Sequence, residues 1–233
     1  MSKKKKQGTE EPVEGVENLL TRTEKYIEDN QKSLTIIVAA IVVVVLGYLG
    51  YRNLYIAPME EEARSQVFMA ERYFERDSFY LALYGDGNFL GFLDIIDEYA
   101  PTKTANLANY YAGISFLHMG EFKSAIEHLK KFDSRDQLVS PMAFGAIGDA
   151  YAELGDLETA ATFYTRAAMR RPNEFTSPIF WMKAGQVYEE LEQWGKALEA
   201  YENILDEYPE TTEGREAEKY IARVQLKKER HNR

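Results

Sequence analysis

Three glycines recur through the middle and C-terminal parts of the chain at nearly constant spacing. Gly113, Gly148 and Gly185, called the frame glycines below, stand 35 and 37 residues apart. Self-similarity at a fixed period of this length is typical of proteins built from stacked helical units. Each copy reads as a helix, a turn and a second helix. Such a hairpin is amphipathic on two faces and buries them only against its neighbours, so the repeat predicts an all-α solenoid.

Small and aromatic residues accompany the frame glycines. An alanine follows each glycine by twelve positions, at Ala125, Ala160 and Ala197. Two facing small residues let antiparallel helices approach closely. Gly155-Asp156 is expected to break the first helix of the middle copy, and Pro172 and Pro209 to end second helices. Aromatic side chains are expected to fill the layer between hairpins, at Tyr151, Tyr164, Tyr188 and Tyr201.

These positions resemble the tetratricopeptide repeat over residues 106–210. The middle copy matches nearly every consensus position, the third has Glu192-Gln193 in place of the turn glycine, and the first lacks the closing proline. The resemblance implies three repeats over residues 105–210. Residues 55–104 resemble a degenerate first hairpin, and Thr211 or Thr212 is expected to cap a last helix in a capping segment, 211–233.

A second feature is the uncharged segment Ser33–Tyr51. As a helix its nineteen residues cover about 28 Å, close to the hydrocarbon thickness of a membrane. Lys32 and Arg52 flank it, and tyrosines gather at one end. We expect an uncleaved signal-anchor helix over residues 33–54. The alternatives are a buried core segment and a cleaved signal peptide, although a 32-residue leader is long for the latter.

Residues 1–32 are expected to form a partly disordered cytoplasmic tail. The run Lys3–Lys6 favours a cytoplasmic N-terminus, which places the body of the chain across the membrane. Apolar residues at helical spacing predict a short amphipathic helix that either touches the inner leaflet or a membrane partner, or is a solvated lead-in to the span. They are Val16, Leu19, Leu20, Thr23, Tyr26 and Ile27.

Composition excludes several classes of function. The chain has no cysteine and three histidines in 233 residues, which excludes disulfide scaffolds, thiolate metal sites and cysteine catalysis. The formal net charge of −10 argues against a general nucleic-acid binder. No nucleotide-binding or nucleophile-elbow motif occurs. We therefore expect no enzyme activity, no cofactor and no small-molecule substrate.

Two patterns were weighed as metal sites. The segment Asp86–Asp97 partly matches a calcium loop, but Leu90 stands where an oxygen ligand is needed, so a glycine-rich break before a helix cap is favoured. His118 and His128 lie ten residues apart without a paired ligand. We expect His118 to line the repeat groove and His128 to face solvent, with no bound metal.

In stacked hairpins the first helices line a concave groove. Its candidate lining residues are Tyr110, Ile114, His118, Met142, Asp149, Glu153, Ile179, Met182, Gln186 and Glu190. The groove is expected to hold a protein segment with apolar anchors and a basic flank. The alternative is that its apolar members are packed by the first hairpin and the cap. The carboxylates are expected to repel a chain-terminal carboxylate, and the basic clamp that some such domains use for it is missing.

The whole layout resembles the YfgM-type ancillary subunit of the Sec translocon. That resemblance implies a bacterial inner-membrane protein with a cytoplasmic N-terminus and periplasmic repeats, associated with SecYEG and a periplasmic peptidyl-prolyl isomerase chaperone. The stretch Tyr208–Ala217 resembles repeats of outer-membrane assembly proteins, so an envelope-biogenesis scaffold is the second hypothesis. The third is an organelle-surface receptor with reversed topology and cytosolic repeats.

Overall fold

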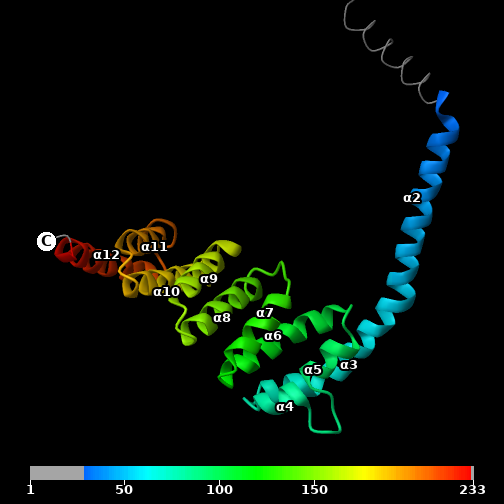
Figure 1. Ribbon diagram of the computed structural model, residues 1–233, viewed down its shortest axis with the longest axis horizontal. Coiled ribbons are helices and arrows are strands. Elements are labelled where there is room, and N and C mark those ends of the chain that lie inside the picture. Colours follow the sequence, from blue (N-terminus) through cyan, green and yellow to red (C-terminus); the bar gives the residue numbers. More distant parts are fainter. Residues whose placement is uncertain (1–28, 232–233) are drawn as a thin grey trace, which may run out of the picture. The chain divides into compact units, whose positions relative to one another are not determined.

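The computed structural model describes residues 29–231, which form helices joined by turns (Figure 1). No β-strand occurs among these residues. The expected lysine-rich run and amphipathic helix of the tail lie outside the described residues. By compactness the chain divides into two units, Met1–Ala57 and Pro58–Arg233, and each is described by itself.

The first unit contains the apolar helix. Helix α2 (Gln31–Tyr51) has no buried residue and continues into a π-helical turn, η1 (Arg52–Ile56). The rings of Tyr51 and Tyr55 stack with centroids 5.4 Å apart. Among the described residues, the helical run Gln31–Phe74 is the one that is long and apolar enough to cross a membrane, and its apolar window is unburied.

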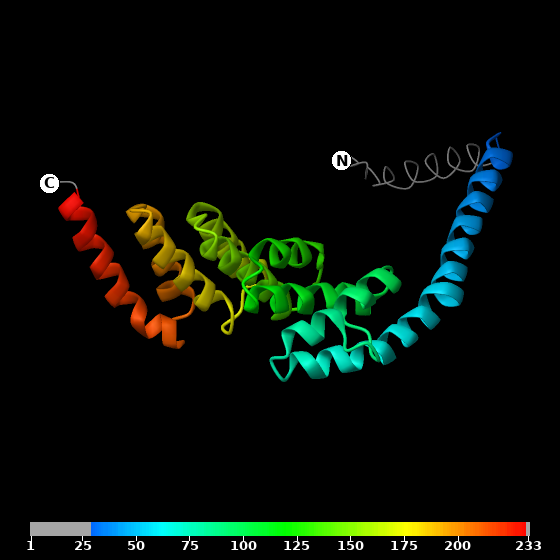
Figure 2. The ribbon, with the colours of Figure 1, turned by 60° about the horizontal axis from the view of Figure 1, so that its bottom comes forward.

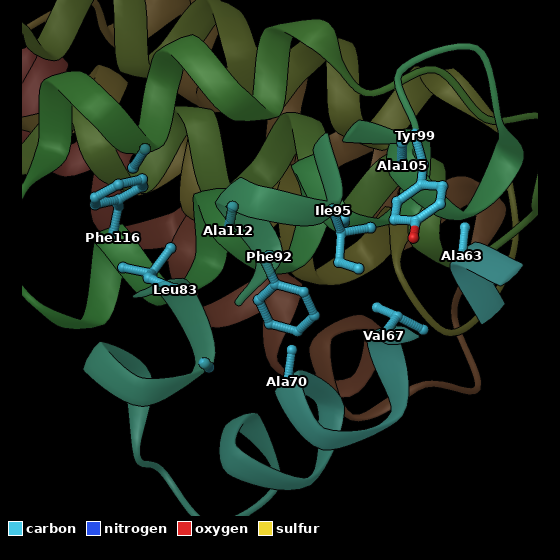
Figure 3. Packing of buried hydrophobic residues seen from close by; sticks show 13 residues of the cluster. Ala63, Val67, Ala70, Leu83, Phe92, Ile95, Tyr99, Ala105, Ala112 and Phe116 are labelled. Atoms are coloured by element: carbon cyan, nitrogen blue, oxygen red, sulfur yellow. The ribbon is translucent and has the colours of Figure 1, made fainter. Parts of the chain in front are cut away.

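The second unit begins with three helices, in the region where a degenerate hairpin, a glycine-rich break and a resumed helix were expected. They are α3 (Ala57–Phe74), α4 (Phe79–Tyr84) and α5 (Phe92–Glu98). The chain breaks after α4 at Gly85, whose φ of +71° suits glycine. Figure 3 shows side chains of all three helices meeting α6 in one apolar core, including Ala63, Val67, Ala70, Leu83, Phe92, Ile95, Ala112 and Phe116.

Three helical hairpins follow in chain order (Figures 1 and 2). They pair α6 (Lys103–His118) with α7 (Phe122–Lys131), α8 (Val139–Glu153) with α9 (Leu157–Arg170), and α10 (Ser177–Glu190) with α11 (Trp194–Glu207). Helix α12 (Thr212–His231) packs on α11 and α10. The prediction of an all-α solenoid with a further C-terminal helix is confirmed.

Each frame glycine receives a side chain from the second helix of its own hairpin, sixteen residues further on. A Cβ at Gly148 would lie 2.7 Å from the Tyr164 ring, and one at Gly113 would lie 2.5 Å from Leu129 Cγ. Tyr201 fills the same place against Gly185. Tyr164 and Tyr201 therefore fill the interface inside each hairpin. They also meet the next element, since Lys183 Nζ of α10 lies 5.4 Å from the Tyr164 ring centroid and the ring centroids of Tyr201 and Tyr220 of α12 are 5.2 Å apart.

The other two repeat tyrosines lie against the preceding hairpin. The Tyr151 hydroxyl accepts a hydrogen bond from Lys130 Nζ of α7 at 2.9 Å, and the Tyr188 hydroxyl lies 3.3 Å from Thr165 Oγ1 of α9. These contacts join consecutive repeats.

The turns between paired helices share one backbone geometry. Seven residues after the frame glycines, Gly120 and Gly155 have φ of +77° and +78°. Glu192 takes the same position with φ of +57°, so the third copy keeps the left-handed turn without glycine. The Asp156 carboxylate caps α9 by accepting a hydrogen bond from the Thr159 N–H at 3.2 Å.

Candidate functional site: a groove along the first helices

A groove of about 810 Å³ runs along the first helices of the three hairpins. Helix α6 contributes five side chains, α8 three and α10 three, because one face of each first helix is left free by its paired helix. The residues from α6, α8 and α10 are Tyr110, Tyr111, Ile114, Leu117, His118, Met142, Ala146, Asp149, Ile179, Phe180 and Lys183. Phe74 of α3, Leu138, Phe175 and Thr176 complete the lining.

The structure brings six of the ten sequence-predicted residues into this groove: Tyr110, Ile114, His118, Met142, Asp149 and Ile179. Three others, Glu153, Gln186 and Glu190, are exposed but do not line it. At spacings of three, four and seven residues they continue the lining stripes of α8 and α10 beyond Asp149 and Lys183, the last lining residues of these helices.

Met182 is the tenth residue, and its assignment to the groove was wrong. Its side chain is 9% exposed and belongs to an apolar cluster with Ala197 and Tyr201 of α11 and Val224 of α12. Met182 therefore packs in the core shared by α10, α11 and α12 and not on the free face.

Several groove residues were missed by sequence reasoning. Phe175 is 74% exposed and lies in the loop between α9 and α10. Asn173 shapes that loop, because its side-chain oxygen accepts hydrogen bonds from the N–H groups of Phe175 and Thr176, each at 2.9 Å. An asparagine directly after Pro172 was the available signal for such a turn, but helix-face counting does not consider loops.

The carboxylate of Asp149 is already paired within the groove. It accepts hydrogen bonds from the Tyr164 hydroxyl at 2.7 Å and from Lys183 Nζ at 2.6 Å. Burial, and then the hydrogen bond to Asp149, raises the pKa of Tyr164 well above its usual range. The part of a bound segment that lies over Asp149 therefore gains little from a positive charge, while the basic flank expected beside the exposed Glu153 and Glu190 stays a prediction.

The remaining surface of the groove is aromatic and aliphatic. His118 stacks on Phe79 with ring centroids 4.5 Å apart, and Phe74 meets Tyr111 edge-on at 5.0 Å. Met142 and Ile179 are 47% and 42% exposed. Large apolar side chains gathered in a hollow on the surface are typical of sites that bind other proteins.

His128 was expected at a solvent face, and that expectation was wrong. Its Nδ1 lies 3.1 Å from Asn109 Oδ1, and its ring stacks on Phe116 at 5.4 Å. Burial lowers the pKa of His128 below its usual value. The imidazole is thus half-buried in the interface between α6 and α7.

The loop that was weighed as a calcium site uses its first carboxylate internally. Asp86 Oδ1 accepts hydrogen bonds from the N–H groups of Asn88 and Phe89, and Oδ2 accepts one from the Tyr73 hydroxyl, all at 2.9 Å. Asp94 then accepts a hydrogen bond from the Gly91 N–H at 3.0 Å, at the start of α5. Over residues 29–231, no group of three or more histidine or acidic side chains is placed to hold a metal ion.

Comparison with known families identifies the repeats. Tetratricopeptide-repeat family models match residues 110–174 and residues 181–211. The first match covers most of α6 through α9, and the second covers most of α10 and all of α11. No curated protein matches the chain. The repeats are therefore tetratricopeptide repeats, and the matches do not extend to the YfgM-type family.

Proposed function

We propose that this tetratricopeptide-repeat chain is a membrane-anchored scaffold that binds another protein through the groove along α6, α8 and α10. The groove itself carries the proposal, because about 810 Å³ of hollow surface is lined mainly by apolar side chains on three consecutive first helices. Tetratricopeptide domains mediate protein–protein interactions, and solenoids present such elongated concave surfaces to their ligands. The proposed role involves no catalysis and no cofactor.

The bound segment is proposed to be apolar and uncharged. Asp149 and Lys183 neutralise each other at 2.6 Å, so a charged ligand gains little from either. Met142 and Ile179 present flexible and branched apolar surface at equivalent positions of α8 and α10, each six residues before its frame glycine. A helix or an extended strand with aliphatic or aromatic anchors satisfies this lining, and methionine adapts to ligands of varied shape.

The finer proposal concerns location and partners. Helix α2 is proposed to anchor the chain in a bacterial inner membrane, with the lysine-rich tail in the cytoplasm and the repeats in the periplasm. The layout of tail, single span and acidic repeat unit supports an accessory role at the Sec translocon. The groove would then contact SecYEG, a periplasmic peptidyl-prolyl isomerase chaperone or an emerging chain.

The test compares two methionine variants of the full chain in gently solubilised membranes. Met142→Glu places a charge in the groove, whereas Met169→Glu changes a 62% exposed methionine of α9 that does not line it. Mass spectrometry of the purified complexes is expected to show translocon subunits and a folding catalyst with the wild type and with Met169→Glu. With Met142→Glu, their enrichment is expected to fall at least about tenfold, because an unpaired charge is buried on binding.

Other outcomes decide against parts of this proposal. Equal enrichment with both variants would show that the groove is not the binding surface. Outer-membrane assembly factors without translocon subunits would replace the translocon role with an envelope-biogenesis scaffold. A topology reporter fused after Arg233 that is active in the cytosol would establish the reversed orientation.

A further inference from the structure

Helix α12 begins in the same way as the first helix of a repeat. Thr102 precedes α6 and Thr211 precedes α12. Each threonine hydroxyl donates to the carbonyl of a tyrosine three residues earlier, at 2.6 Å and 2.8 Å. Each also accepts a hydrogen bond from the backbone N–H three residues later, at 3.0 Å. Because α12 then packs on both helices of the preceding hairpin, it occupies the place of a fourth first helix.

Two independent spacings place the frame position of α12 at the same residue. The capping threonines Thr102 and Thr211 are 109 residues apart, and 109 residues after Gly113 stands Ala222. The last repeat spacing of 37 residues, counted from Gly185, also reaches Ala222. The repeat register is therefore known across α12.

This register identifies the face of α12 that corresponds to the face where a first helix binds its second helix. This face is called the seat below. In α10 that seat is made by Gly185, which receives the Tyr201 ring of α11, and by Glu189, which accepts a hydrogen bond from the Tyr201 hydroxyl at 2.8 Å. Relative to the frame position they stand at 0 and +4. The residues of α12 at the same two positions are Ala222 and Leu226, and Lys219 lies three residues before Ala222.

In α12 this seat is open. All three residues are exposed, and Leu226 is 57% exposed. They line a hollow of about 480 Å³ together with Arg223, Lys227 and Arg230. Within the described part of the chain, no element covers this face.

We propose that the seat on α12 binds an acidic amphipathic helix of a partner protein, which completes a fourth hairpin in trans. Helical shape follows from the register, since the frame position receives a side chain of a second helix in each of the three complete repeats. Acidic character follows from charge, because four cations and no carboxylate line the hollow. Arg223 and Lys227 also pair with Glu189, yet their side chains stay 44% and 47% exposed. The Ala222 methyl group leaves less room than a frame glycine, so the central residue of the partner helix is smaller than tyrosine.

A peptide from this chain provides the probe. Residues 191–208 include α11, the helix that occupies the equivalent seat on α10, and carry carboxylates at Glu199, Glu202, Asp206 and Glu207. The fluorescent peptide carries the substitution Tyr201→Ala to suit Ala222, and it is titrated with the detergent-solubilised full chain by anisotropy. Saturable binding is expected.

Matched variants on α12 locate that binding. Leu226→Glu is expected to weaken it at least about tenfold, while the neighbouring exposed change Gln225→Glu leaves it within about twofold. Lys219→Glu is expected to weaken it several-fold, while Lys228→Glu, with the same change in charge outside the hollow, has a smaller effect.

A variant that is expected to bind more tightly controls for variants that lose binding only because they misfold. The unaltered peptide, which keeps Tyr201, is expected to bind the Ala222→Gly chain about tenfold more tightly than the wild type, because the glycine accommodates the ring as Gly185 does. Absence of saturable binding below about 1 mM, or equal effects of Leu226→Glu and Gln225→Glu, overturns the proposal. Self-association that is lost with Leu226→Glu assigns the seat to a second copy, and binding that appears only after removal of residues 1–28 assigns it to the chain's own tail.

Discussion

Replacing Gly148 with alanine tests whether the frame glycines determine how closely the paired helices approach. The new Cβ would lie 2.7 Å from Cδ1 and Cε1 of Tyr164, which is closer than carbon atoms pack. Tyr164 is 4% exposed and its hydroxyl is held by Asp149 at 2.7 Å, so the ring has no free space to enter.

The expected loss of stability follows from two costs and one gain. Overpacking a core costs about 1–3 kcal/mol. Weakening the hydrogen bond from Tyr164 to the Asp149 carboxylate costs up to about 1.5–3 kcal/mol more. The higher helix preference of alanine returns about 1 kcal/mol. We expect a net loss of about 2 kcal/mol in the free energy of unfolding.

The assay is urea denaturation of the detergent-solubilised full chain, followed by tryptophan fluorescence. The chain has two tryptophans, Trp181 and Trp194, and both lie in the repeats, so the signal reports the second unit. Gly195→Ala is the matched control, because no heavy atom lies within 4 Å of its new Cβ. That control is expected to be neutral or to stabilise by up to about 1 kcal/mol.

A double-mutant cycle identifies the cause. In a Tyr164→Ala background the ring is gone, so Gly148→Ala is expected to lose most of its cost. An unchanged cost in that background would refute the proposed clash. So would a single Gly148→Ala variant that is as stable as the Gly195→Ala control.

Three further predictions concern the third repeat and α12. Glu192→Gly is expected to stabilise the repeats by about 0.5–1 kcal/mol in the same denaturation assay. A residue other than glycine costs about 1–2 kcal/mol in the left-handed conformation, and the larger entropy that glycine loses on folding offsets part of this gain. An unchanged denaturation midpoint would contradict this. Burial raises the pKa of Glu189, but hydrogen bonds from Arg223, Lys227 and Tyr201 outweigh it and hold the pKa below its usual value. The stabilisation by the Glu189 carboxylate is therefore complete above the ordinary glutamate pKa and is lost as pH falls through the lower pKa of the folded state. The stability advantage of wild type over Glu189→Gln is expected to shrink on acidification in that range. A difference that stays constant with pH would exclude this dependence on Glu189 ionisation. Thr211→Ala is expected to cost about 1 kcal/mol through loss of the α12 cap, whereas Thr212→Ala, which lacks that hydrogen bond, is expected to cost less; equal effects in thermal unfolding would count against the cap.

Local patterns in the sequence were sufficient to predict the elements. The frame glycines, the turn at Gly155 and the closing prolines each act within one hairpin, so their spacing predicted three hairpins and a further helix. The uncharged segment Ser33–Tyr51 likewise predicted the apolar helix α2, because its length and composition are properties of a contiguous segment. The turn at Asp77-Ser78 and the break at Gly85, which together divide the first region into three helices, were visible, but their effect on packing was not.

The faces of the helices were decided by tertiary contacts. Met182 and Glu190 both fit a groove-facing stripe on α10, yet α11 and α12 bury the first and leave the second outside the groove. The sequence indicated a free carboxylate at Asp149, but in the structure its Oδ1 lies 2.6 Å from Nζ of Lys183, thirty-four residues away. Along this chain, sequence alone determined which segments are helical and where they turn, because those preferences are local. Only the stacked structure decided which side chains are buried, paired or free to bind, because small changes in helix rotation and the identity of the neighbouring helix select among adjacent faces.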